Sequence, residues 1–267
     1  MKIKDARVLI TGATGGIGRH IAAGLAGHGA KIALVGRKQA ALDELKAHLT
    51  EQYGVEVHAI NADLASAEGR QTLLTEVRKA MGGIDLLINN AGVVDFHDFS
   101  EQDPAMIDRI YQTNLIAPVQ LTREILPDLI RQGHGRVVNI GSTFGSIGFA
   151  WFAAYSSSKF ALRGFSEALR RELDGTGVGV SYIAPRAVKT AANSQAVYEM
   201  AQATKMNMDE PDTVAAFVVR CIRNDKEIAY YGWPEKLFVR INALLPTLVD
   251  GALRKQNRIM ARFAPKS

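Results

Sequence analysis

The stretch of sequence that decides the fold reads Thr11-Gly12-Ala13-Thr14-Gly15-Gly16-Ile17-Gly18. It follows an apolar strand candidate at residues 8–11 and precedes a helix candidate at residues 17–27. Glycines let the backbone turn tightly and come close to a phosphate. The first turn of the helix adds amide donors and the positive end of the helix dipole. Strand, glycine-rich turn and helix in this order predict a phosphate-binding turn at the start of an α/β fold.

The rest of the chain repeats the alternation of short β-branched runs and longer amphipathic segments. The strand candidates cover residues 8–11, 31–35, 55–60, 85–89, 136–140, 178–184 and 227–231. The helix candidates cover residues 17–27, 39–53, 66–81, 104–132, 155–173 and 211–224. Such alternation favours right-handed βαβ units. We therefore expect a Rossmann-type, doubly wound parallel sheet of about seven strands with helices on both faces.

The domain organisation follows from the absence of a repeat or a linker-like stretch. We expect residues 1–232 to form one nucleotide-binding and catalytic domain, with a substrate lid at residues 191–208. Residues 233–267 form a basic amphipathic extension of the same domain. Pro118 and Pro127 lie inside the long helix candidate, which should kink or divide there.

Composition excludes several classes of protein. The 267 residues are 47% hydrophobic, which suits a globular core. No apolar run is long enough for a membrane span, and the first residues do not resemble a signal peptide, so we expect a cytoplasmic protein. Cys221 has no possible disulfide partner in the chain, and the six histidines lack ligand spacing, so no metal site is expected.

The net charge of +5 is concentrated at the end of the chain. Residues 233–267 contain seven basic residues against Glu235 and Asp250, which gives +5 for this segment alone. The remaining chain is neutral overall. The charge therefore describes a basic tail, and we expect no nucleic-acid partner.

The residues after the second strand candidate bear on the choice of nucleotide. Dinucleotide-binding folds that take NAD(H) place an acid there, which binds the ribose 2′-hydroxyl. This chain reads Gly36-Arg37-Lys38 instead. Two cations suit a 2′-phosphate, and arginine matches phosphate geometry. We predict NADP(H) as the cofactor, with Arg37 as the main contact and Lys38 beside it.

A possible acid/base pair follows the fifth strand candidate. Tyr155 and Lys159 are four residues apart and would share one face of a helix, and Ser142 lies thirteen residues before Tyr155. A free phenol titrates near pH ~10, and a nearby cation lowers its pKa. The pair could therefore supply a general acid or base near neutral pH.

These motifs together resemble those of the classical short-chain dehydrogenase/reductase family. The glycine run has that family's Thr-Gly-x-x-x-Gly-x-Gly spacing, and Asn89-Asn90-Ala91-Gly92 and the Tyr-x-x-x-Lys pair match its signatures in order. The resemblance covers residues 8 to 190. It implies an oxidoreductase that transfers a hydride between nicotinamide and a carbonyl or alcohol substrate, and a homodimer or homotetramer. With the cations at Arg37 and Lys38, we expect this enzyme to depend on NADP(H).

The resemblance also implies roles for single residues. Ser142 would bind the substrate carbonyl and Tyr155 would deliver the proton. Lys159 would hold the nicotinamide ribose and lower the pKa of Tyr155, and Asn114 would hold a water that links Lys159 to solvent. The predicted cofactor contacts are Thr11, Gly12, Thr14, Gly15, Gly16, Ile17, Gly18, Arg37, Lys38, Asp63, Leu64, Asn90, Ala91, Gly92, Tyr155, Lys159, Pro185, Val188 and Thr190.

One position departs from the family pattern. The loop after the sixth strand reads Pro185-Arg186-Ala187-Val188-Lys189-Thr190, with Arg186 where the family has glycine. Arg186 could be a surface residue or could reach a substrate anion. The expected substrate side is apolar, which suggests a lipophilic substrate, and comprises Val93, Val94, Phe96, Phe144, Ile147, Phe149, Trp151, Phe152, Val197, Met200, Met206 and Met208.

Several alternatives remain open. The tail continues to a basic helix expected near residues 253–263, and it could contact an anionic membrane surface, pack on a partner subunit or cap the pocket. A non-catalytic NADP-binding redox sensor or scaffold is an alternative function, although Ser142, Tyr155 and Lys159 are all present. A nucleotide-sugar epimerase shares the Tyr-x-x-x-Lys pattern but usually needs a longer C-terminal domain.

Overall fold

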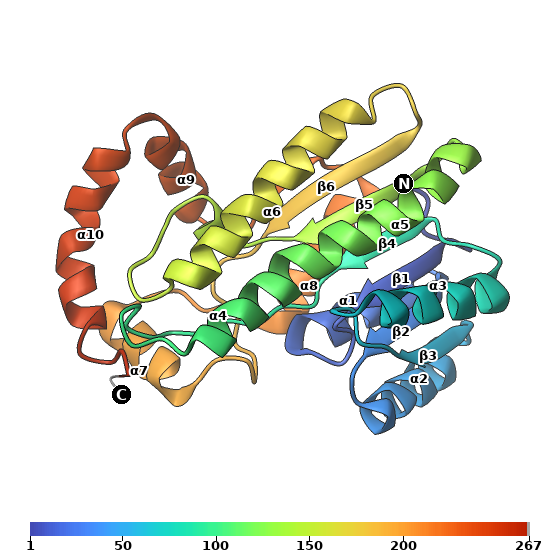
Figure 1. Ribbon diagram of the computed structural model, residues 1–267, viewed down its shortest axis with the longest axis horizontal. Coiled ribbons are helices and arrows are strands. Elements are labelled where there is room, and N and C mark those ends of the chain that lie inside the picture. Colours follow the sequence, from blue (N-terminus) through green and yellow to red (C-terminus); the bar gives the residue numbers. More distant parts are fainter. Residues whose placement is uncertain (266–267) are drawn as a thin grey trace.

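The computed structural model describes residues 1–265 and is built on one parallel sheet (Figure 1). Its strands lie in the order β3-β2-β1-β4-β5-β6-β7. Their bounds are β1 (Arg7–Thr11), β2 (Lys31–Gly36), β3 (Val57–Asn61), β4 (Leu86–Asn89), β5 (Gly135–Ile140), β6 (Val178–Ala184) and β7 (Ile228–Tyr230). The chain reverses direction across the sheet between β1 and β4, and crevices at such switch points bind ligands in open α/β sheets. The predicted doubly wound fold is confirmed.

Helices cover both faces of this sheet. The covering helices are α1 (Gly16–Ala26), α2 (Gln39–Tyr53) and α8 (Pro211–Arg223) on one face, and α3 (Ala67–Met81), α5 (Ala117–Gln132) and α6 (Ala153–Glu172) on the other. The remaining helices are α4 (Pro104–Tyr111), α7 (Gln195–Thr204), α9 (Glu235–Leu244) and α10 (Pro246–Met260). Side chains alternate along each strand. In β1, Val8 and Ile10 pack in the core under α1, α2 and α8, whereas Leu9 packs in the core under α3, α5 and α6.

The long helix predicted at residues 104–132 is divided in the structure. A π-helical turn, η1 (Gln112–Ile116), separates α4 from α5. Pro118 has no amide hydrogen to offer the carbonyl of Asn114 one turn earlier, which favours a break in the α-helical ladder here. Pro127, in contrast, lies inside α5 and does not end it.

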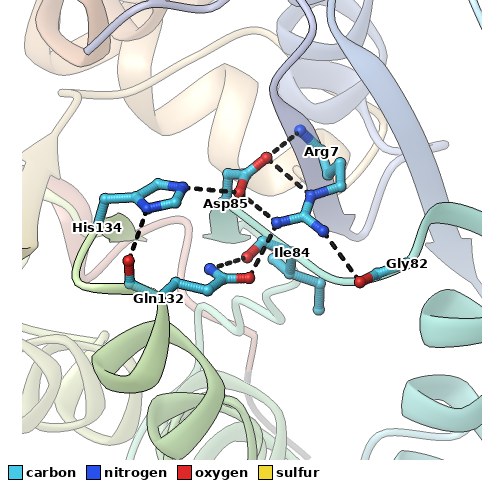
Figure 2. Close-up of polar contacts among 6 residues, drawn as sticks. All are labelled: Arg7, Gly82, Ile84, Asp85, Gln132 and His134. Atoms are coloured by element: carbon cyan, nitrogen blue, oxygen red, sulfur yellow. Dashed lines mark hydrogen bonds and ion pairs between the residues drawn. The ribbon is translucent and has the colours of Figure 1, made fainter.

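The amino ends of β1, β4 and β5 are joined by a polar cluster around Arg7 (Figure 2). The Arg7 guanidinium donates to both Asp85 carboxylate oxygens, at 2.6 and 3.0 Å, and to the side chain of Gln132 at 2.9 Å. Gln132 in turn donates to the carbonyl of Ile84, and His134 Nε2 lies 3.4 Å from Asp85. These groups satisfy one another, so the cluster fastens the sheet at the edge opposite the glycine turn.

The C-terminal extension is helical over more of its length than predicted. The basic helix α10 begins at Pro246 and ends at Met260, and a second helix, α9, precedes it. Figure 1 shows the two as a hairpin at one end of the molecule, beyond the carboxyl ends of the strands. Lys266, one of the seven predicted basic residues of the tail, lies outside the described residues.

Candidate active site

The glycine turn after β1 leaves no room for larger side chains. Gly12 has a φ of +61°, and a Cβ there would lie 2.8 Å from the Cα of Ala91. A Cβ on Gly16 would lie 2.5 Å from the methyl carbon of Thr190. The turn is therefore packed between the loop after β4 and the loop after β6, as a close backbone cradle requires.

Side chains hold this cradle in place and leave its amide donors available. The Thr11 hydroxyl accepts from the backbone N–H of Asn90 at 3.0 Å, and the Asn90 amide donates to the carbonyls of Thr11 and Gly12 at 3.1 Å. Helix α1 starts after Gly15 with no side chain capping its first amides. Those donors and the helix dipole suit a pyrophosphate, so the residues fit a dinucleotide.

A cavity of about 630 Å³ runs from this cradle along the carboxyl ends of the strands. Of the predicted cofactor contacts, those that line it are Thr11, Gly12, Thr14, Gly15, Gly16, Ile17, Arg37, Asp63, Leu64, Asn90, Ala91, Gly92, Tyr155, Lys159, Pro185, Val188 and Thr190. Gly18 and Lys38 do not line it. Gly18 packs against the carbonyl of Gly12, where a Cβ would come within 2.3 Å, so it shapes the turn from behind.

Two cations stand at the end of β2. Arg37 and Lys38 are exposed, and neither forms an ion pair within residues 1–265. Arg37 borders the cavity, and the carbonyl of Arg37 accepts weakly from the Asn61 amide at 3.5 Å. The two charges are therefore available to an anion that lies beside β2.

The candidate catalytic side chains meet at the middle of the cavity. The Tyr155 phenol lies near enough to Ser142, which follows β5, for the serine side chain to lower its pKa. The Nζ of Lys159, one helical turn further along α6, lies 5.9 Å from the centre of the Tyr155 ring and donates to the carbonyl of Ile140 at 3.0 Å. The predicted face of α6 thus brings phenol, hydroxyl and ammonium together.

Burial governs how Tyr155 and Lys159 titrate. It raises the pKa of the Tyr155 phenol, and the hydrogen bond with Ser142 only partly opposes it. The predicted lowering of the Tyr155 pKa is therefore wrong for this structure, because desolvation outweighs any effect of the neighbouring ammonium. Burial also lowers the pKa of Lys159 to about 8. At neutral pH the phenol consequently carries its proton.

Asn114 lies in η1 and is almost fully buried behind the cavity wall rather than on its surface. Its side-chain oxygen accepts from the backbone N–H of Val93 at 2.7 Å, and its amide donates to the Val93 carbonyl and to Ser158 at 2.8 and 3.1 Å. Asn114 therefore ties the π-helical turn to the loop after β4 and to α6.

Tyr182 bonds to the backbone of a candidate catalytic residue, a contact that the sequence analysis missed. It is buried in β6, and its hydroxyl accepts from the backbone N–H of Ser142 at 3.3 Å and donates to the Ser142 carbonyl at 3.1 Å. Its ring also fills the space beside Gly141, where a Cβ would lie 2.2 Å from it. The single aromatic ring in the strand was the only signal in the sequence. Tyr182 positions Ser142.

Arg186 borders the cavity and is held there by acidic side chains. Its guanidinium forms a two-pronged ion pair with Asp209, at 2.7 and 2.8 Å, and binds Glu235 at 3.0 Å. These hydrogen bonds and charges raise the pKa of Arg186. The side chain thus joins the loop after β6, the end of the lid segment and the start of α9, so the prediction of a free surface residue was wrong. Contact with a substrate anion stays a prediction.

The substrate side of the cavity is apolar, as predicted, but with fewer residues. The predicted residues that line it are Val93, Val94, Phe144, Phe152, Val197, Met200 and Met206. Phe96, Phe149 and Trp151 instead pack in a small core with α7 and α10. Ile147 packs against α9 and α10, and Met208 does not border the cavity. Arg109 and Asn193 also line it and were not predicted.

Within residues 1–265 no group of three His, Cys, Asp or Glu side chains could hold a metal ion. None of the helices in this part of the chain is both long and apolar enough to cross a bilayer.

Comparison with known proteins places this site in a family. The family model for short chain dehydrogenases matches residues 6–201. The ketoacyl reductase HetN of Nostoc sp. is 35% identical over 92% of this chain and 88% of its own. A short-chain dehydrogenase from Sphingobium yanoikuyae, solved with NADPH, is 29% identical with a TM-score of 0.77 and covers 93% of this chain and 95% of that one.

A third comparison bears on the fold alone. A short chain dehydrogenase/reductase from Burkholderia phymatum, solved with NAD, has a TM-score of 0.84 at 23% identity and covers 93% of this chain and 96% of that one. The matched residues 6–201 hold the glycine turn and every candidate catalytic side chain described above. The chain belongs to the short-chain dehydrogenase family of nicotinamide-dependent oxidoreductases.

Proposed function

We propose that the protein is an NADPH-dependent reductase of lipophilic carbonyl compounds. The observation that carries this proposal is that Ser142, Tyr155 and Lys159 line the same cavity as the glycine cradle. A phenol that holds its proton at neutral pH suits the acid in carbonyl reduction.

Each side chain has a separate task in this reaction. A bound nicotinamide supplies the hydride. Ser142 and Tyr155 donate hydrogen bonds to the substrate oxygen as negative charge develops on it, and Tyr155 then gives up its proton. Lys159, held by the carbonyl of Ile140, places a positive charge beside the resulting phenolate. Asn114 keeps η1 and the loop after β4 in register beside this group.

The preference for NADP(H) is supported by Arg37 and Lys38. Both side chains are exposed at the end of β2 without an ion-pair partner in residues 1–265, and no carboxylate takes the place of the ribose-binding acid. The Sphingobium relative was solved with NADPH and the Burkholderia structure with NAD, so this pair of relatives leaves the choice to residues of this chain.

The lipophilic substrate is supported by the cavity wall. Phe144, Phe152 and the lid residues Val197, Met200 and Met206 border the space next to Tyr155. The name of the HetN relative, a ketoacyl reductase, fits a carbonyl on an acyl chain. A non-catalytic sensor would not need Ser142, Tyr155 and Lys159 assembled at one point.

The experiment that tests the function is an NADPH-oxidation screen over ketones and 3-oxoacyl compounds graded by chain length. We expect turnover to rise with apolar size, and the Tyr155→Phe protein serves as the blank. A chain-length series with no activity above that blank would refute the reductase assignment.

A second experiment tests the cofactor. Arg37→Ala should weaken NADPH binding by roughly 10- to 100-fold, because it removes a charge-assisted hydrogen bond to phosphate, and should leave NADH binding unchanged. Lys46→Ala removes an exposed cation of α2 away from the cavity and is the control. If NADPH affinity is the same in both variants, Arg37 does not read the 2′-phosphate.

A further inference from the structure

The α9–α10 hairpin exposes large apolar side chains at its tip. Leu244, Leu245 and Leu248 lie at and just after the turn between the two helices and are 81%, 56% and 61% exposed. Trp233, at the base of the hairpin, is 70% exposed. Figure 1 shows the hairpin at the end of the molecule, with α10 forming its outer edge.

The same hairpin carries a concentration of positive charge. Its exposed cations, none of which forms an ion pair within residues 1–265, are Lys236, Arg240, Arg254, Lys255, Arg258 and Arg262. Of its two acids, Glu235 is bound to Arg186, so Asp250 is the only acid left to oppose these charges. Leu248 and Lys255 are seven residues apart in α10 and therefore share its outward face.

The inward face of α10 already has partners. Val249 and Leu253 pack with Ile147, which follows β5, and Met260 packs with the lid residues Val197 and Met200. These contacts hold the hairpin on the molecule without the tip leucines. Lys236 lies over the Phe217 ring of α8. The leucines and the other cations together form an outward surface that makes no such contact with the rest of the described fold.

The charge on this surface favours one kind of occupant. In a two-fold dimer through the hairpin each patch would meet its own copy, so the cations of one subunit would face the cations of the other. An anionic lipid surface offers phosphates to the cations and acyl chains to the leucines. We propose that the α9–α10 hairpin docks the protein on an anionic phospholipid membrane, with the tip leucines inserted at the level of the headgroups.

Docking in this way would also orient the site. Helix α10 contacts the lid helix α7. A membrane bound to the outward face of α10 would therefore lie beside the lid rather than beside α2 and α3 at the opposite end of the molecule (Figure 1). The inference does not depend on the substrate, because it rests on surface residues outside the cavity.

The test is co-sedimentation of the full chain with vesicles of phosphatidylcholine alone or mixed with phosphatidylglycerol, at low and high salt. We expect binding to the anionic vesicles only, with loss at high salt. The triple variant Arg254→Gln/Lys255→Gln/Arg258→Gln should bind on the order of 100-fold more weakly, since each cation near an anionic surface contributes a factor of about 5. Leu244→Ser/Leu245→Ser/Leu248→Ser should also lose binding.

Matched control variants distinguish binding by this surface from non-specific effects of charge and hydrophobicity. The control variant Lys46→Gln/Lys79→Gln/Arg223→Gln removes three exposed cations elsewhere, and Ile130→Ser removes an exposed apolar residue of α5. Both should bind vesicles like the parent chain, and NADPH binding reports folding in every variant. Three outcomes would overturn the proposal: no binding to anionic vesicles, equal loss in the control variants, or an oligomer that dissociates when the tip leucines are replaced.

Discussion

The two edges of the central sheet are both polar but differ in how their polar groups are used. At the amino edge Arg7, Asp85, Gln132 and His134 bond to one another (Figure 2). At the carboxyl edge Arg37 and the first amides of α1 have no such partners among the described residues. Polar groups that hydrogen-bond to one another stabilise the fold, whereas donors and charges without protein partners are available to bind a ligand. Variants at the carboxyl edge should therefore lose activity, whereas variants at the amino edge should lose stability.

The largest effect is expected at the carboxyl edge. Tyr155→Phe should lower kcat by roughly 1,000-fold, because it removes the proton donor of the reaction. It should leave the thermal midpoint and NADPH affinity almost unchanged, since the ring still packs beside Phe144. Turnover near the parent rate would remove Tyr155 from the mechanism and with it the distinction between the two edges.

Lys159 tests the same difference through stability. Burying its charged ammonium at the carboxyl edge should lower the free energy of unfolding. Burial lowers the pKa of Lys159 from 10.5 to about 8. Between these values the unfolded chain binds more protons than the folded one, so the unfolding free energy rises with pH across this window. Below pH 8 the cost is fully present and amounts to at most about 3 kcal/mol, and above pH 10.5 it is gone.

We therefore expect Lys159→Met to be inactive yet more stable than the parent at pH 7, with the difference shrinking toward pH 10. Denaturant unfolding at pH 7, 9 and 10 measures this, and Lys79→Met, at an exposed lysine of α3, is the control. A difference that does not change with pH would mean that Lys159 is not desolvated.

The amino edge should show the reverse behaviour. Asp85→Ala should lower the unfolding free energy by about 2 kcal/mol, because it leaves the half-buried Arg7 guanidinium without its carboxylate. Turnover per folded molecule should be unchanged. Burial alone would raise the pKa of Asp85, but Arg7 outweighs it and holds that pKa below its usual value.

The sign of that shift sets the pH dependence of the Asp85 variant. The stability that Asp85 contributes is present above the unfolded pKa and is lost as pH falls through the lower folded value. The difference between parent and Asp85→Ala should accordingly shrink in acid. A fall in kcat at pH 7 would instead link the amino edge to the chemistry.

The smallest effect is expected at Tyr182, which contacts both the core and the backbone of Ser142. Tyr182→Phe removes one hydroxyl that bonds to the backbone of Ser142, at a cost of about 1 kcal/mol in stability. Because Ser142 is then held less firmly, kcat should fall by roughly 10-fold with KM for NADPH unchanged. Equal kcat in Tyr182→Phe and the parent would make Tyr182 a packing residue only.

Much of the fold and the site could be predicted from local sequence. Strand, turn and helix are encoded by neighbours, so the cradle at Gly12–Gly18 and the shared face of Tyr155 and Lys159 were found from spacing alone. The contacts that were missed join residues far apart in the chain. Arg186 meets Glu235, forty-nine positions away, and Tyr182 meets Ser142, forty positions away.

The titration of Tyr155 was mispredicted for a related reason. The spacing to Lys159 was visible in the sequence, but the degree of burial was not, and burial determines the direction of the pKa shift. The role of Asn114 as a water-holding residue, the single-domain division at residue 232, the homodimer or homotetramer and the cytoplasmic location stay predictions.

The ion pairs of Arg186 limit which segments of this protein can be exchanged with those of its relatives. The guanidinium joins the loop after β6 to Asp209 and Glu235, so three segments share one charged junction. A chimaera that took residues 191–210 or residues 233–267 from another member would separate the arginine from one of its acids. Only exchanges that carry Arg186, Asp209 and Glu235 together would keep the junction. The segments that contain these residues should therefore be exchanged as one unit.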